Sequence, residues 1–234
     1  MRFKELFNEG GGSDAGKLEL LSTDVKKARA YGEKEFKKNG KELDKEIPDF
    51  DKNYIIAQQK AGIGKTKRKD MPVIASDDVK ALLSKLKNGR IDIHAPFYKK
   101  GDDPFPEGLS GKEAKDWVSH GMKDGVKEDD VITVKLGKES AKNLKPIQQQ
   151  IYFDNSIGKI AADGSKSSKA FLTKKSILVA STDNYIIDGH HRFLSAMLVD
   201  PDLQLPIVKI DLPISKLLPM ALAYGDAIGN KRNK

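Results

Sequence analysis

Residues 183–197 read DNYIIDGHHRFLSAM, a stretch with one carboxylate, two imidazoles and a guanidinium within five residues. Two of the four histidines, His190 and His191, stand side by side between an Asp-Gly pair and Arg192. The β-prone run before them gives way to apolar residues at helical spacing, which predicts a strand, a glycine and a helix that starts near His190. The first turn of a helix offers unpaired N–H groups and the positive end of the helix dipole. The stretch therefore predicts a phosphate site.

Each side chain of the DGHHR motif suits an anionic ligand in a different way. Gly189 lets a ligand approach the backbone closely. The two histidines and Arg192 add donors and positive charge, and Asp188 can orient a histidine or help to hold a metal ion bound to the phosphates. The plain alternative is that Asp188 only caps the helix. A site that binds a metal alone is disfavoured, because adjacent histidines on one helix point in different directions.

A second glycine-containing stretch, AGIGKTKRKDMP, resembles the end of a phosphate-binding P-loop. The full pattern needs a glycine at the position of Gln59 and a strand before it, and neither condition holds, so we reject a P-loop. What remains is a basic segment, residues 60–69, that contains no acidic residue. It is a candidate arm for the phosphates of DNA, or else an exposed turn. Its cations are Lys60, Lys65, Lys67, Arg68 and Lys69.

Composition limits the classes of chemistry that the chain can perform. The 42 Lys and Arg residues against 34 Asp and Glu residues give a formal net charge of +8. This charge is compatible with binding to nucleic acid, a nucleotide or a phosphorylated substrate, and equally with a solvated basic surface, so it favours an anionic ligand only together with other signals. The absence of cysteine removes disulfides, thiolate metal sites and cysteine nucleophiles. No apolar run has the length of a signal peptide or a membrane span, so we expect a cytoplasmic protein with no membrane partner.

Hydrophobic periodicity divides the chain into a basic, mainly helical region over 1–129, a mixed domain over 130–230 and a basic tail over 231–234. In the first region, helices are expected over 17–45, 50–60, 77–88 and 111–122, and His94 and His120 are interpreted as structural. In the second, strands are expected over 131–136, 148–150, 176–180, 185–188 and 205–212, helices over 190–198 and 213–229, and a Ser/Lys-rich loop over 163–169. This order predicts an α+β (or α/β) fold.

DGHHRFLSA, preceded by two short strands and followed by LPIVKIDL, resembles the ParB/sulfiredoxin superfamily. In that family a Gly-x-x-Arg segment opens a helix and cradles nucleotide phosphates. LKPIQQQIY is similar to the family's opening Leu-x-Pro-x-Gln segment, which implies that Gln148 lies against the same pocket. KDMPVI is similar to the upstream part of phage-type members. The resemblance implies a small mixed-sheet nucleotide-binding domain with flanking helices, working in a host cytoplasm.

The residues of the DGHHR motif indicate which activities of this family the chain could have. Sulfiredoxin chemistry is excluded, because it needs a cysteine where this chain has His190. A chromosome-partitioning clamp is disfavoured, because His-His-Arg replaces Glu-Arg-Arg and we expect no helix-turn-helix domain downstream. Two enzymes remain: a hydrolase that cleaves NTP and nicks DNA, and a small-molecule kinase similar to the ParB-fold free-serine kinases. A non-catalytic nucleotide- or DNA-binding module is the third interpretation.

The expected mechanism places ATP, or another NTP, with Mg²⁺ on the helix start from Gly189 to Arg192. Arg192 and His191 would stabilise charge on the transferring phosphoryl group. Asp188 would orient a histidine or bind the metal, and His190 would position or deprotonate the nucleophile. For the kinase, the candidate bases are Asp154 and Asp188. Candidates for stacking on single-stranded bases are Tyr152, Phe153 and Tyr185, and a further basic stretch covers 166–175.

Overall fold

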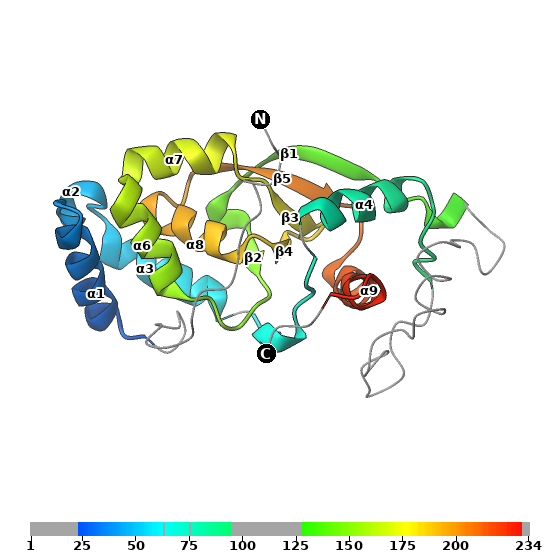
Figure 1. Cartoon of the computed structure of the whole chain (residues 1–234), viewed down its shortest axis with the longest axis horizontal. Helices are drawn as coiled ribbons and strands as arrows, with labels where there is room; N and C mark the ends of the chain where they lie inside the picture. The colour runs from blue at the N-terminus through cyan, green and yellow to red at the C-terminus, as the bar shows by residue number, and fades with distance from the viewer. Residues whose placement is uncertain (1–22, 63, 75, 95–127, 231–234) are drawn as a thin grey trace.

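The computed structural model of the chain describes residues 23–62, 64–74, 76–94 and 128–230. Among them, five strands form one mixed sheet in the order β1-β5-β3-β4-β2, and helices lie against both faces (Figure 1). The strands are β1 (Val134–Ser140), β2 (Lys145–Pro146), β3 (Leu178–Ser181), β4 (Tyr185–Asp188) and β5 (Gln204–Ile210). The α+β class predicted from the sequence is confirmed.

The helices include short 3₁₀ turns, and most of the longer ones precede or follow a strand of the sheet. The α-helices are α1 (Val25–Lys38), α2 (Leu43–Glu46), α3 (Phe50–Ala61), α4 (Ser76–Lys87), α6 (Phe153–Asp163), α7 (Ser165–Lys174), α8 (His190–Val199) and α9 (Ile214–Ala227). The 3₁₀ turns are η2 (Arg68–Asp70), η3 (Glu128–Asp130) and η4 (Ala141–Asn143). The predicted helix at 111–122, with His120, and the tail at 231–234 lie outside the described residues.

Strand pairing decides which segments meet at the DGHHR motif. β1 and β3 flank β5, antiparallel and parallel respectively, and β4 pairs antiparallel with β3. The short β2 runs parallel to β4, with Lys145 opposite Tyr185 and Pro146 opposite Ile186. The two strands therefore run in the same direction, and the residues after β2 lie beside the start of α8. Past β2, the strand predicted over 148–150 is reduced to one bridge at Gln148.

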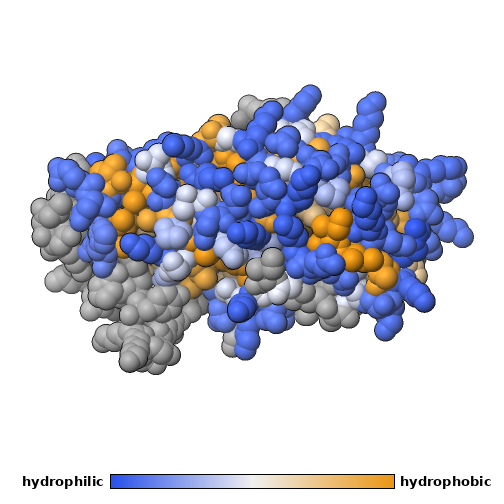
Figure 2. Space-filling view, turned by 180° about the vertical axis from the view of Figure 1, so that it is seen from behind, coloured by the Kyte–Doolittle hydropathy of each residue, from blue (hydrophilic) through white to orange (hydrophobic). Residues whose placement is uncertain are grey.

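Each face of the sheet has its own core, because successive residues of a strand point to opposite faces. Ile186 and Ile207 contribute to a core with α3, α6, α7 and α8, whereas Ile187 and Ile210 contribute to a second core with α4 and α9. Figure 2 shows that hydrophilic residues cover most of the back of the molecule, with smaller hydrophobic patches between them. Large hydrophobic side chains that remain exposed include Ile55, Val131 and Leu136.

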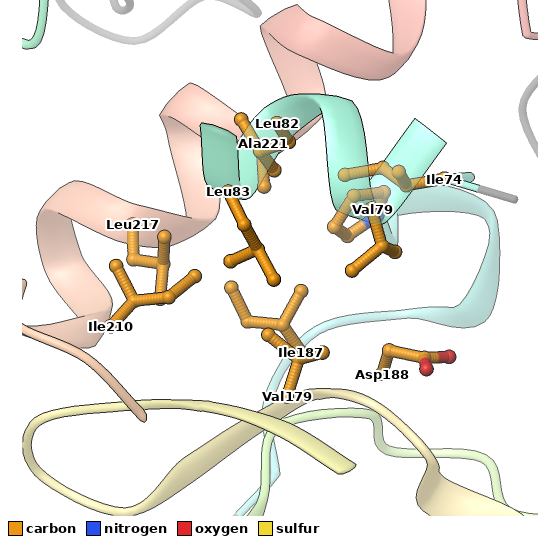
Figure 3. Close-up of a pocket in the computed structure, with 11 residues that line it drawn as sticks. Ile74, Val79, Leu82, Leu83, Val179, Ile187, Asp188, Ile210, Leu217 and Ala221 are labelled. Carbon is orange, nitrogen blue, oxygen red and sulfur yellow. The ribbon is translucent and has the colours of Figure 1, made fainter. Parts of the chain in front are cut away.

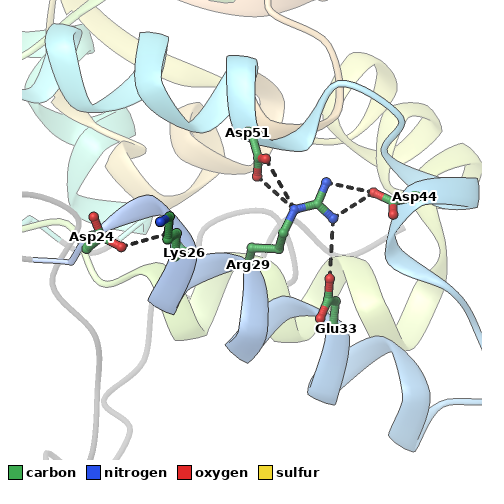
Figure 4. A network of polar contacts seen from close by, with 6 residues as sticks. All are labelled: Asp24, Lys26, Arg29, Glu33, Asp44 and Asp51. Atoms are coloured by element: carbon green, nitrogen blue, oxygen red, sulfur yellow. Dashed lines mark hydrogen bonds and ion pairs between the residues drawn. The ribbon is translucent and has the colours of Figure 1, made fainter.

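The N-terminal helices complete the first of these cores. Tyr54 of α3 and Phe153 of α6 are fully buried and meet edge to face, with ring centroids 5.2 Å apart. Outside this core, Arg29 of α1 ties three helices together, since its guanidinium contacts Asp44, Asp51 and Glu33 (Figure 4). Residues 23–61 thus share a core with the sheet. The boundary predicted at residue 129 stays a prediction, because residues 95–127 lie outside the described part.

Two further element predictions are wrong. The helix expected over 17–45 ends at Lys38, where Asn39 and Gly40, with φ of 67°, stop it before α2. The loop expected over 163–169 is largely the helix α7, which starts directly after Gly164. The first turn of α7 is satisfied from a distant part of the chain: Glu46 of α2 accepts hydrogen bonds from the N–H of Ser165 at 2.7 Å and from its hydroxyl at 2.8 Å. No local pattern could reveal that cap.

The cap by Glu46 yields a prediction on stability. Because the N–H and hydroxyl of Ser165 bond its carboxylate, the pKa of Glu46 lies below its ordinary value. Such a group stabilises the fold above its unfolded pKa of about 4.3, and the contribution fades as the pH falls through the lower folded pKa. Glu46→Ala should lower the free energy of unfolding by about 1 kcal/mol at neutral pH.

The measurement is urea unfolding between neutral and acidic pH. The difference between wild type and Glu46→Ala should shrink as the pH falls below about 4. The matched control is Glu42→Ala, which removes an exposed carboxylate that is bonded to Lys45 within the same helical segment. An equal loss in both variants, or a loss that does not change with pH, would contradict the cap.

Candidate functional site

A glycine turn joins β4 to α8 at the DGHHR motif, where the sequence predicts it. Gly189 has a φ of 104°, which side chains rarely tolerate. An added Cβ would lie 2.8 Å from Cγ of Leu178 and 3.0 Å from Nη2 of Arg192. Both the backbone conformation and the lack of space therefore require glycine at this position. The turn places the first residues of α8 directly behind the end of the strand.

Arg192 folds back over this turn. Its Nη2 donates to Oδ2 of Asp188 at 2.6 Å, one helical turn earlier, and its side chain is only 10% exposed. The ion pair joins the last residue of β4 to the first turn of α8. Arg192 thus supports the turn from inside. Exposed positive charge at this helix start must come from other side chains.

His190 and Gln148 meet beneath the same helix start. His190 is 3% exposed, and its Nε2 accepts a hydrogen bond from the backbone N–H of Gln148 at 3.4 Å. A ring nitrogen that accepts cannot carry a proton, so this contact requires the tautomer with a bare Nε2. The side-chain amide of Gln148 donates to the carbonyl of Gln150. The structure brings Gln148 to the motif, as the family resemblance implies, and it gives His190 a buried position.

His191 is the half-buried histidine of the pair. Its ring lies parallel to that of Tyr152, with an interplanar angle of 8° and centroids 6.3 Å apart. Its backbone carbonyl accepts a hydrogen bond from the hydroxyl of Ser156 at 3.1 Å. Because Tyr152 directly precedes α6 and Ser156 lies in its second turn, the starts of α6 and α8 are held together around this ring pair.

The basic segment reaches the same place by a backbone crossing. The N–H of Thr66 donates to the carbonyl of Ile147 at 3.0 Å, and the carbonyl of Thr66 accepts from the N–H of Gln149 at 2.8 Å. A Cβ on Gly64 would lie 2.8 Å from the carbonyl oxygen of Gln148. The glycine that resembles a P-loop residue is therefore needed for this close approach. It follows the helix α3 instead of a strand, in agreement with the rejection of a P-loop.

Arg68 joins the pair of rings as a third planar side chain. Its guanidinium carbon lies 4.9 Å from the centroid of Tyr152, and its backbone N–H donates to Oε1 of Gln150 at 3.4 Å. We call this set the Arg68–Tyr152–His191 column. Lys65 and Lys67 are exposed in the same segment, and the side chain of Lys69 lies outside the described part. Sequence reasoning named all three column residues but gave no sign that they meet, because they come from separate elements.

Other predicted residues are placed elsewhere. Phe153 is fully buried, which excludes it as a stacking residue for bases. Tyr185 lies at the start of β4, the end opposite to Asp188, with Nζ of Lys145 5.0 Å from its ring centroid. Asp154 lies in the first turn of α6 near Tyr31. Burial raises the pKa of Tyr31, and the carboxylates of Glu35 and Asp154 raise it further.

The fit of Mg²⁺ depends on a single carboxylate. Within residues 23–94 and 128–230, as far as they are described, no three His, Asp or Glu side chains are grouped to hold a metal ion. Mg²⁺ in nucleotide sites is bound by one or two carboxylates together with phosphates and water. Asp188 is already ion-paired with Arg192, so it does not form a resident metal site by itself. The predicted role of Asp188 as a metal ligand stays a prediction.

A small apolar cavity ends at Asp188. It measures about 30 Å³ and lies between α4, α9 and the second face of the sheet, with Leu83 and Ile187 among its aliphatic lining residues. Figure 3 shows the carboxylate of Asp188 at the edge of this aliphatic group. By this measure the cavity has room for about two water molecules, which is too little for a nucleobase.

Comparisons with protein-family models, with curated proteins and with solved structures returned no match to this chain. The resemblance to the ParB/sulfiredoxin superfamily and the activities that it implies therefore stay predictions. In the part of the chain that the structure describes, we find no helix with the length and apolar character needed to cross a membrane.

The ion pair under the glycine turn yields a double-mutant prediction. Arg192→Ala would leave the carboxylate of Asp188 without its guanidinium, and this should lower the free energy of unfolding by about 2 kcal/mol. Asp188→Ala should also destabilise the fold. The double variant should lose less than the sum of the two single losses, because one interaction is removed in all three. Urea unfolding measures all four proteins. Strict additivity would contradict the structural role of the pair.

Proposed function

We propose that this protein is a nucleotide-binding hydrolase that holds the phosphates of ATP, or of another NTP, at the start of α8 and contacts DNA through its basic segment. The observation that carries the proposal is the Arg68–Tyr152–His191 column. It joins two stretches that the sequence separately marks as anion-binding. A helix start, a glycine turn and a basic segment then form one surface, which is a suitable place for a chain of phosphates.

The phosphates would meet three kinds of donor on this surface. The first-turn N–H groups of α8 and its dipole attract negative charge. His191 and Arg68, which both contact Tyr152, add side-chain donors, and Lys65 and Lys67 add further positive charge in the basic segment. Since these groups are fixed before the ligand arrives, they need little reorganisation in a transition state.

In this proposal, the buried residues of the motif position the exposed ones. The pair of Asp188 and Arg192 holds the helix start against the strand, and His190 holds the backbone of Gln148. Hydrolysis would then proceed by in-line attack of water on the terminal phosphorus, which breaks the bond to the bridging oxygen, so that the nucleoside diphosphate leaves and the water's protons pass to the released phosphate and to solvent. Catalysis would come from positioning and charge stabilisation. His191 is the less buried histidine of the pair, so we assign to it the contact with the reacting phosphoryl group. Nicking of DNA would be the same displacement at a phosphodiester.

A phosphate-release assay tests this function. Wild-type protein with Mg²⁺ and ATP or CTP should release phosphate, and His191→Ala should reduce the rate about 100-fold. The matched control is His94→Ala, which removes an exposed imidazole in the loop after α4 and should keep the wild-type rate. Supercoiled DNA is added in parallel to record nicking. No release by wild type, or equal release by His191→Ala, would overturn the proposal.

A second candidate function is phosphoryl transfer to a small molecule. The position of Asp188 favours it, since a kinase needs a base next to the phosphate site and this carboxylate lies directly before the start of α8. The apolar cavity at Asp188 is too small to hold the acceptor, which would therefore bind outside it. The same assay decides between the two, because turnover that depends on added free serine, with phosphoserine as product, would favour the kinase over the hydrolase.

A further inference from the structure

We infer that the Arg68–Tyr152–His191 column stacks on an unpaired nucleobase, so that the nucleic acid bound by this surface is single-stranded. The inference rests on the proposed function, because it places the polynucleotide on the same surface as the nucleotide phosphates. It deepens that function by naming the class of nucleic acid. The argument depends on the geometry of the column, on the way it is held and on the charges beside it.

The column consists of three half-buried planar groups. Arg68 and His191 both lie against the ring of Tyr152, so a base would stack on the outward side of Arg68 or of His191. The rings of Tyr152 and His191 are parallel within 8°, and the guanidinium carbon of Arg68 lies 4.9 Å from the centre of the tyrosine ring. Bases stack on aromatic rings and on guanidinium planes, and this contact tolerates any base because every base has a π-face.

Backbone contacts hold the column in position. The segment that carries Arg68 is fixed on residues 147–149 by the hydrogen bonds of Thr66 and by the close crossing at Gly64. The helix that carries His191 is fixed to α6 by the hydroxyl of Ser156. Arg68 itself is bound through its N–H to the side chain of Gln150. A platform that is ordered before binding loses little conformational entropy when a base stacks on it.

The charges beside the column suit the phosphates on either side of a stacked base. Lys65 and Lys67 are exposed, and the segment 60–69 contains no acidic residue. Lysine side chains contribute sequence-independent affinity for phosphates. Lysines alone would bind duplex and single strand alike. The column separates the two, because the faces of duplex bases are covered by their neighbours and an unpaired base can turn out onto a ring.

Fluorescence anisotropy tests the inference. The probes are a labelled thymidine strand of about 16 nucleotides, a uridine strand of the same length and a matched duplex. Wild type should bind both single strands more tightly than the duplex. Tyr152→Leu removes the ring against which Arg68 and His191 lie but keeps an apolar side chain, and it should weaken single-strand binding about tenfold while duplex binding changes little. Tyr152→Phe keeps the ring and should bind as wild type does.

Two controls match these variants. Tyr185→Leu removes the other half-exposed candidate ring, at the far end of β4, and should leave single-strand affinity unchanged. Lys65→Ala combined with Lys67→Ala should weaken single strand and duplex together and flatten the salt dependence, whereas Lys34→Ala with Lys37→Ala removes two exposed lysines of α1 and should do neither. Circular dichroism checks that each variant is folded.

Equal affinity of wild type for duplex and single strand would overturn the inference, and so would wild-type affinity in a folded Tyr152→Leu protein. If Tyr152→Leu does not fold, Arg68→Lys decides instead, since it keeps the charge and loses the planar group. Its single-strand affinity should fall several-fold, and an unchanged affinity would overturn the inference. Failure of the proposed function is seen separately, as absence of ATP binding and of phosphate release by wild type.

Discussion

The turn at Gly189 is the constraint on which the candidate site depends. The strand β4, which contributes to both cores, ends at Asp188, and the helix α8 begins only two residues later. Only a glycine with positive φ fits between them, because Leu178 and the guanidinium of Arg192 leave no room for a side chain. The ion pair of Arg192 with Asp188 closes the turn from inside. Asp188 and Arg192, which the sequence suggests as ligand-binding groups, thus bind each other. The proposed contacts with a ligand then fall to His191 and Arg68.

The parallel pairing of β2 with β4 is the second feature that determines which residues meet at the candidate site. It carries the chain from Pro146 to the start of α8, where the backbone of Gln148 bonds His190 and the basic segment crosses over it at Gly64. This crossing brings Arg68 onto the ring of Tyr152. Gly64 therefore allows close packing of two backbone segments, and the cations that follow it lie near the DGHHR motif. A column of planar groups at a helix start is the result.

Much of the local structure could be predicted from the sequence, and the assembly of the site could not. The β-prone YIID run and the apolar spacing after DGHH correctly placed β4 and α8, because period and glycine punctuation are local signals. Gln148 was placed near the motif only through a family resemblance. The cap of α7 by Glu46 and the contact of Arg68 with Tyr152 depend on tertiary packing between distant segments. The four-residue spacing of Asp188 and Arg192, which suits an ion pair, is the local signal from which the burial of Arg192 could be predicted.

The proposed phosphate-binding surface contains both Arg68 and His191. The most direct test is the affinity for ATP, measured by calorimetry, of wild type, Arg68→Ala, His191→Ala and the double variant. If both side chains contact one ligand through a shared column, each single change weakens binding and the combined loss departs from the sum by at least about 0.5 kcal/mol. Losses that add within error, or affinities equal to that of wild type, would contradict the account.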